Sequence, residues 1–113
     1  MASLQSKYFI MGMTEIYSCD HYKVLNVILN AGEKMPWHQA TSNAFLICKK
    51  GKGRITFSDR VVDVCANDTL LLKANEQHQV EIFEDFCSNI ILDFDGKINF
   101  VKEKSQPFSM SIY

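Results

Sequence analysis

The chain has 113 residues, of which 47% are hydrophobic, and a formal net charge of −1. This length supports one compact domain, and the near-neutral charge provides no basic patch for nucleic acid or for an anionic membrane surface. β-Branched and aromatic residues far outnumber alanine, which favours β-sheet over a helical bundle. We therefore expect a sheet-rich domain with neither nucleic acid nor membrane as a partner.

The N-terminal residues show no pattern of a targeting or membrane-spanning segment. The apolar run at 8–13 is shorter than a secretory signal and far shorter than the roughly 20 apolar residues of a spanning helix.

The four cysteines match neither the spacing of a zinc ribbon nor that of a disulfide framework. They are Cys19, Cys48, Cys65 and Cys87. We predict a cytoplasmic protein with reduced, mostly buried thiols.

Short apolar runs between turn residues predict an all-β chain. In chain order, strands are expected at 8–13, 22–29, 34–40, 43–49, 53–57, 60–64, 69–72, 78–83 and 89–94. The intervening turns contain Gly, Asn, Asp or Ser, including a hairpin turn at 50–52. An apolar period of 3.6 residues is not sustained anywhere, so no DNA-reading helix is predicted.

The strand at 43–49 is apolar on both faces. Ala44, Leu46 and Cys48 share one face, whereas Phe45 and Ile47 share the other. A strand of this kind needs cover on both sides, either by a second sheet plus a terminal strand or by a partner subunit. We therefore predict a homodimer in which Phe45 and Ile47 lie at the interface.

Two sequence motifs then carry a family resemblance. The first cupin motif, G-x5-H-x-H-x3-E-x6-G, has the spacing of Gly32, His38, Ala40, Ala44 and Gly51. The second, G-x5-P-x-G-x2-H, maps without a gap onto Asn67, Lys73, Asn75 and His78. The chain therefore resembles a small single-domain cupin, which implies a double-stranded β-helix, also called a jelly-roll barrel.

The resemblance also implies a degenerate metal motif. The family holds a metal with three histidines and one glutamate; His38 and His78 keep two of these positions, while Ala40 and Ala44 replace the other two. We expect either no metal or a weakly bound divalent ion, Zn, Fe or Ni, on His38 and His78. Asn67 and Asn75 replace glycines, and Asn tolerates a positive φ.

Strand parity relative to the family's ligand positions predicts the lining of a central cavity. The predicted lining residues are His38, Ala40, Ala44, Leu46, Cys48, His78 and Val80. Trp37 has the opposite parity and is expected to pack at the rim or at an interface, and His21 is expected at the surface or at a strand edge. The predicted organisation is one domain over 1–113, with a barrel core at about 22–94, an N-terminal strand at 8–13 and a C-terminal tail at 95–113.

Three functions are compatible with this reading. The leading hypothesis is a stand-alone cupin that binds a small organic ligand in its barrel, with His38 and His78 as polar contacts. The second is a metal-dependent isomerase or dioxygenase, against which the missing ligands count. The third is the sensor domain of an AraC-like regulator, against which the lack of a helical DNA-binding segment in the 113 residues counts.

Overall fold

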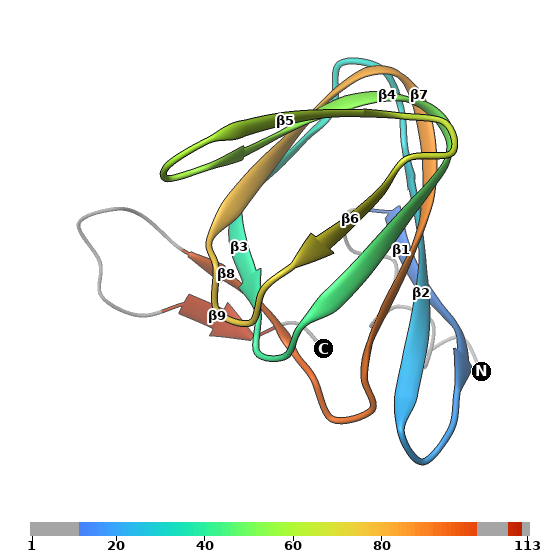
Figure 1. Cartoon of the computed structure of the whole chain (residues 1–113), viewed down its shortest axis with the longest axis vertical. Helices are drawn as coiled ribbons and strands as arrows, with labels where there is room; N and C mark the ends of the chain where they lie inside the picture. Colours follow the sequence, from blue (N-terminus) through green and yellow to red (C-terminus); the bar gives the residue numbers. More distant parts are fainter. Residues whose placement is uncertain (1–11, 102–108, 112–113) are drawn as a thin grey trace.

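The computed structural model describes residues 12–101 and 109–111, and these residues form antiparallel β-strands joined by short turns (Figure 1). The expected all-β class is confirmed. The strands are β1 (Met13–Ser18), β2 (Tyr22–Leu29), β3 (Lys34–Ala40), β4 (Ala44–Phe57), β5 (Val61–Cys65), β6 (Thr69–Leu72), β7 (His78–Asp93), β8 (Ile98–Val101) and β9 (Ser109–Ser111). In the described residues, no helix is long and apolar enough to cross a membrane.

Strands β4 and β7 are each longer than the sequence predicts. The expected strands at 43–49 and 53–57 are one strand, β4, and those at 78–83 and 89–94 are one strand, β7. The predicted turn at 50–52 was wrong. The chain instead bends within the ladder, where the pairing of β4 with β7 shifts register between Cys48 and Gly53. Such irregularities let a strand turn a corner without ending.

The two ends of the chain also differ from the prediction. Most of the strand expected at 8–13 lies outside the described residues, and the strand that is described there, β1, begins at Met13. Sequence reasoning missed β1 because its later residues, Ile16 and Tyr17, are exposed and give no alternating apolar pattern. In the expected tail, β8 pairs with β3 and buries Ile98 and Phe100, so the core extends beyond residue 94.

Because β4 and β7 bend, they run through two sheets that face each other (Figure 1). We call the first the apolar sheet: β6, residues 44–48 of β4, residues 86–93 of β7, β2 and β1. We call the second the histidine sheet: β5, residues 53–57 of β4, residues 78–82 of β7, β3, β8 and β9. The two inner faces enclose the core, which is the double-stranded β-helix arrangement that was predicted.

Gly51 occupies the corner of β4 between the two sheets. Its φ is 91°, and a Cβ at this position would collide with the backbone carbonyl of Asp85 in the matching bend of β7. A side chain there would therefore meet both backbone strain and a rigid obstacle. Asn67 and Asn75 adopt φ values of 78° and 65°, which confirms the expectation that these turns accept Asn in place of glycine.

The four cysteines are free thiols, as expected, but they are not mostly buried. Cys48 is buried, Cys19 and Cys87 are half-buried, and Cys65 is exposed. Burial raises the pKa of the Cys48 thiol above its ordinary value. Cys48 is thus a neutral part of the core and is unsuited to act as a thiolate ligand.

Candidate functional site

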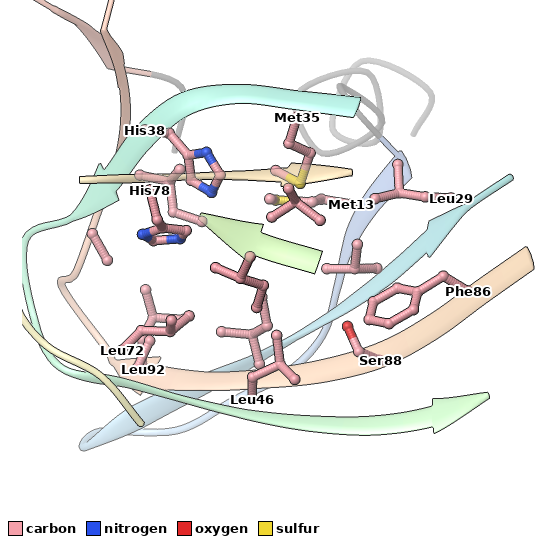
Figure 2. Close-up of a pocket in the computed structure, with 17 residues that line it drawn as sticks. Met13, Leu29, Met35, His38, Leu46, Leu72, His78, Phe86, Ser88 and Leu92 are labelled. Atoms are coloured by element: carbon pink, nitrogen blue, oxygen red, sulfur yellow. The ribbon is translucent and has the colours of Figure 1, made fainter. Parts of the chain in front are cut away.

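A cavity of about 40 Å³ lies between the two sheets (Figure 2). Six of the seven predicted residues line it: His38, Ala40, Ala44, Leu46, His78 and Val80. Cys48 does not, because the β4 bend begins beside it and its Sγ lies 3.6 Å from the Lys50 carbonyl oxygen. Since one water needs roughly 10–15 Å³ by this kind of measure, the cavity holds more than one water but is small for an organic ligand.

The two histidines form a direct cross-strand pair on the inner face of the histidine sheet. His38 of β3 lies opposite His78 of β7 in the ladder, and their ring centroids are 4.3 Å apart in an edge-to-face arrangement. They are 6% and 4% exposed, respectively. Register extends this row on both sides, to Phe57 of β4 and Phe100 of β8, which contact His78 and His38 with their rings. The row thus has four rings in contact, and its two central rings, His38 and His78, line one end of the cavity.

A bulge in β3 brings His38 into this row. Residues three apart on a regular strand face opposite sides, yet Met35 and His38 are both buried and both line the cavity. The register against β7 shifts between them, and Pro36, which has no backbone N–H, sits within the shift. Trp37 is half-buried and does not line the cavity, in line with its predicted parity, and His21 is exposed as expected.

Backbone carbonyls determine which ring nitrogen of each histidine carries the proton. His38 Nδ1 lies 2.6 Å from the Pro36 oxygen, and His78 Nδ1 lies 2.9 Å from the Glu76 oxygen. A carbonyl oxygen only accepts, so each Nδ1–H donates. In a neutral imidazole, Nε2 is then a hydrogen-bond acceptor. The structure thus places two acceptor nitrogens on neighbouring rings at the cavity.

Burial keeps both imidazoles neutral. The pKa of His38 is lowered to about 3, mainly by desolvation and in smaller part by the nearby His78, against the opposing effect of its bond to the Pro36 carbonyl. The pKa of His78 is also lowered, mainly by burial, against the opposing effect of its bond to Glu76. At neutral pH, therefore, the pair offers lone pairs and no positive charge.

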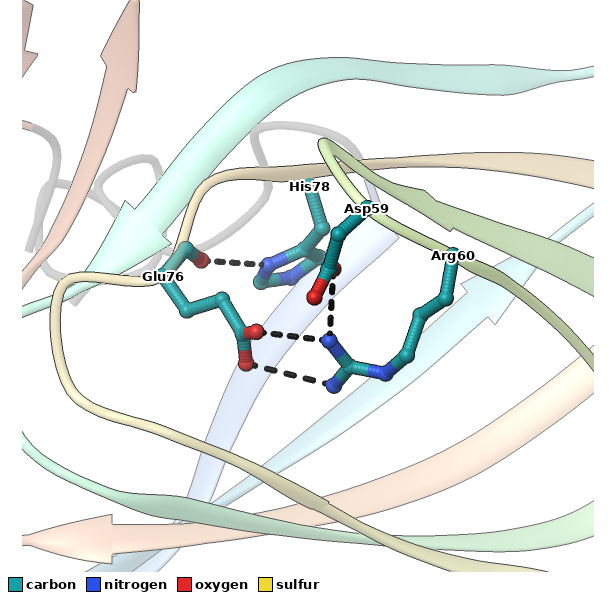
Figure 3. Close-up of polar contacts among 4 residues, drawn as sticks. All are labelled: Asp59, Arg60, Glu76 and His78. Carbon is teal, nitrogen blue, oxygen red and sulfur yellow. Dashed lines mark hydrogen bonds and ion pairs between the residues drawn. The ribbon is translucent and has the colours of Figure 1, made fainter.

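An ion pair supports the loop that carries the His78 hydrogen bond (Figure 3). The Arg60 guanidinium lies 2.8 Å from one carboxylate oxygen of Glu76 and 3.4 Å from the other, and it also contacts Asp59. It stacks over Phe57 with its central carbon 3.8 Å from the ring centroid. Arg60 lowers the pKa of the Glu76 carboxyl. Two loops at this end of the barrel are thereby joined next to His78.

Ser88 is a cavity residue that sequence reasoning missed. It is fully buried on β7, and its Oγ has no hydrogen-bond partner among the described residues. Figure 2 shows its hydroxyl pointing inward at the end of the cavity away from the two imidazoles. Ser88 has the same strand parity as the apolar residues Phe86 and Leu92, and this parity is the sequence signal that predicts an inward position. Ser88 lies outside the two cupin motifs, the second of which ends at His78.

The cavity does not fit the metal centre of typical cupins. Ala40 and Ala44 line it where the other two ligands would stand. Within residues 12–101 and 109–111, no three His, Cys, Asp or Glu side chains lie close enough to hold a metal ion together. A structural metal site generally has four protein ligands and a catalytic one three. The pair His38 and His78 alone provides two.

Solved structures share this fold. A cupin superfamily protein from Desulfitobacterium hafniense aligns over 74% of this chain and 76% of its own, with a TM-score of 0.67 and 19% identity. A cupin-like protein from Thermotoga maritima aligns over 79% and 74%, with a TM-score of 0.71 and 16% identity. The DMSP lyase DddQ from Ruegeria pomeroyi aligns over 77% of this chain and 49% of its own, with a TM-score of 0.66 and 13% identity.

These likenesses, all below 20% identity, show the cupin fold, and no protein of curated function is significantly similar in sequence. Sequence does match one family description, "AraC-like ligand binding domain", over residues 30–86, which is half of the chain. That segment contains β3 to β6 and the first part of β7, hence both cavity histidines. The chain therefore belongs to the AraC-like ligand-binding domain family and is a small cupin.

Proposed function

We propose that this protein binds a small organic molecule in the cavity between its two sheets. The observation that carries the proposal is the cross-strand pair His38 and His78, buried on a wall that is otherwise apolar and aimed at an internal space. A few convergent polar groups in an apolar cavity are typical of small-molecule sites. The family match supports the same function.

The cavity must widen to take a molecule of more than a few atoms. Met13 from β1 and Met35 from β3 both line it, and both project into the space near the histidines (Figure 2). Methionine has three rotatable side-chain bonds and adapts to irregular spaces at small cost. Movement of these two side chains is the route by which a ligand gains room without disturbing the β-ladders.

A cavity-filling variant tests this proposal. Saturation-transfer NMR with a library of small fragments is expected to give binders for the wild-type protein. Ala40→Leu places a larger side chain in the cavity and is expected to abolish their binding. Gln39→Leu is the matched control, since Gln39 is the neighbour on β3 and does not line the cavity. Fragments that bind all three proteins equally, or none, would contradict the proposal.

A regulatory role is the second candidate, and the family match over residues 30–86 favours it. In such a role, ligand binding must change a surface that a partner senses. Light scattering with and without a fragment found above tests this directly. A ligand-dependent change of mass supports the regulatory role, whereas an unchanged mass at saturating ligand favours simple binding or transport.

The expected partner is a second copy of the chain. Phe45, on the outer face of the apolar sheet, is 41% exposed, and Ile47 beside it is half-buried. A partner subunit would cover both residues and remove apolar surface from water, at roughly 25 cal/mol per Å². The four free thiols support a reducing compartment such as the cytoplasm.

A further inference from the structure

The polar groups of the cavity have a definite hydrogen-bonding character. His38 and His78 donate through Nδ1 to backbone carbonyls, which leaves each Nε2 as an acceptor. Acceptor nitrogens on two adjacent rings favour a ligand group that is a hydrogen-bond donor. They disfavour a group with only lone pairs, because lone pairs that face each other repel and remain unsatisfied.

At the other end of the cavity, the buried Ser88 Oγ has no protein partner among the described residues. A hydroxyl both donates and accepts, so it is satisfied by a water or by almost any polar atom of a ligand. An unsatisfied buried hydroxyl is unfavourable, and a molecule or a water that reaches Ser88 removes that cost. Ser88 therefore extends the site along the cavity without adding charge.

The remaining described wall is apolar. It consists of Met13, Val27, Leu29, Met35, Ala40, Ala44, Leu46, Ile55, Leu72, Val80, Phe86, Ile90, Leu92 and Ile98. Neither a lysine nor an arginine stands among these described lining residues to neutralise an anion. Arg60, the cation nearest to His78 in Figure 3, is engaged by Glu76 and Asp59. An anionic ligand would lose its hydration here and gain no opposite charge from a described lining residue.

From this arrangement we infer that the ligand is an uncharged, mostly apolar alcohol or phenol whose hydroxyl donates to the Nε2 atom of either His38 or His78. The inference rests on the proposed function and narrows it to one chemical class. Carboxylates, phosphates and polyhydroxylated sugars do not match: the first two bring charge, and the third brings more polar groups than the wall satisfies. Ethers and halides of the same size match the wall but lack the donor.

Three rings of similar size separate these classes. Phenol carries a donor, fluorobenzene has nearly the same shape without one, and benzoate carries a negative charge. At neutral pH, the wild-type protein is expected to bind phenol about tenfold more tightly than fluorobenzene, which corresponds to about 1.4 kcal/mol, and to show no binding of benzoate. Titration followed by methyl NMR yields all three dissociation constants with one preparation.

Variants test whether the histidines cause the preference for phenol over fluorobenzene. The double variant His38→Phe/His78→Phe keeps both rings of the aromatic row but removes both acceptors, and it is expected to make phenol and fluorobenzene bind within twofold of each other. His21→Phe, at an exposed position, is the control and is expected to retain the tenfold ratio. Because the ratio is also measured in the wild type, the inference stays testable if the double variant fails to fold.

The outcomes distinguish failure of the predicted ligand class from failure of the proposed cavity binding. Fluorobenzene binding as tightly as phenol, or benzoate binding more tightly than phenol, would overturn the ligand class while cavity binding itself stands. Failure of all three rings, together with an empty fragment screen, would overturn the proposed function and the ligand class with it. A phenol preference that persists unchanged in the double variant His38→Phe/His78→Phe would show that the histidine pair is not the acceptor.

Discussion

The outer faces of the two sheets are built from different chemistry, although the same two strands run through both. Across the apolar sheet, strand register aligns one row of apolar residues: Leu71, Phe45, Ile91, Val24 and Tyr17. Across the histidine sheet it aligns a row of alternating charge: Lys34, Glu81, Arg54 and Asp63. Opposite charges placed side by side suit a face in water, whereas a continuous apolar row suits a face that is covered.

On the inner faces, the buried imidazoles belong to the histidine sheet. The histidine sheet carries the two buried imidazoles, while the described inner face of the apolar sheet carries Ser88 and the buried Lys23 of β2 among aliphatic and aromatic side chains. The pair of buried imidazoles that lines the cavity thus lies on the inside of one sheet, and the apolar row lies on the outside of the other. Ligand contact and subunit contact are predicted to use separate sheets, which the following experiments test.

The largest expected effect comes from restoring metal ligands to both sheets. Ala40→His adds a metal ligand on β3 of the histidine sheet, and Ala44→Glu adds one on β4 of the apolar sheet. Loss of even an indirect partner of a ligand typically costs 10- to 100-fold in affinity, so we expect the double variant to gain roughly 10² to 10⁴ in zinc affinity, or roughly 3 to 5.5 kcal/mol. Elemental analysis of purified protein measures the metal content.

Wild-type protein is the control, and we predict that it binds Zn, Fe or Ni weakly. Tightly bound stoichiometric metal in the wild type would contradict this prediction and favour the metal-dependent enzyme. A double variant that folds, as judged by circular dichroism, yet gains no metal would show that His38 and His78 are not arranged as in metal-binding cupins.

The corner that joins the two sheets gives the next largest effect. Gly51→Ala combines a positive φ with a collision against the Asp85 carbonyl, and we expect it to lower the free energy of unfolding by about 3 kcal/mol. Gly32→Ala is the matched control: its φ is also 91°, but nothing lies within 4 Å of an added Cβ, so about 1 kcal/mol is expected. Urea unfolding compares the two, and equal losses would refute the role of the corner.

His38, one of the two buried histidines of the histidine sheet, predicts a pH dependence. The His38 pKa falls from 6.5 in the unfolded chain to about 3 in the folded one, so the unfolded chain binds the proton more readily. Stability is therefore complete above pH 6.5 and declines as the pH falls toward 3, by about 1.4 kcal/mol per pH unit. Between pH 6.5 and pH 5, we expect a loss of about 2 kcal/mol.

Urea unfolding of the wild type and of His38→Gln over this range measures the slope. The variant removes the titrating group and is expected to show a shallower slope, whereas His21→Gln, at an exposed position, is expected to keep that of the wild type. Equal slopes in the wild type and His38→Gln would show that His38 does not titrate in this way.

The smallest expected effect concerns the predicted homodimer. Phe45→Lys places a charge in the middle of the apolar row and is expected to weaken dimerisation at least tenfold, or about 1.4 kcal/mol. Sedimentation equilibrium is expected to give twice 13.0 kDa for the wild type and a shift toward 13.0 kDa for the variant.

Arg54→Ser is the matched control on the other outer face. It removes an exposed ion pair with Asp63, whose N–O distance is 2.8 Å, and it is expected to leave the mass unchanged. A wild type that is monomeric at every concentration, or a dimer that only Arg54→Ser disrupts, would contradict the assignment of the interface to the apolar sheet.

Much of the candidate site could be read from the sequence because it depends on short spacings. The two motifs located His38 and His78, and the period of two along a strand predicted that Ala40, Ala44, Leu46 and Val80 each point inward from their strands. The positive φ at Asn75 follows from the type of residue that a tight turn accepts. Each of these features is determined within a few residues of chain.

The rest depends on contacts between residues far apart in the chain. Gly51 lies where β4 bends against Asp85 of β7, and Cys48, at the start of that bend, does not line the cavity. Register between β3 and β7, with its bulge, decides that His38 meets His78, and the pairing of β8 with β3 brings Phe100 to that row. Local periodicity determines on which face of its strand a side chain lies. Only the pairing and packing of the strands determine which side chains on that face become neighbours.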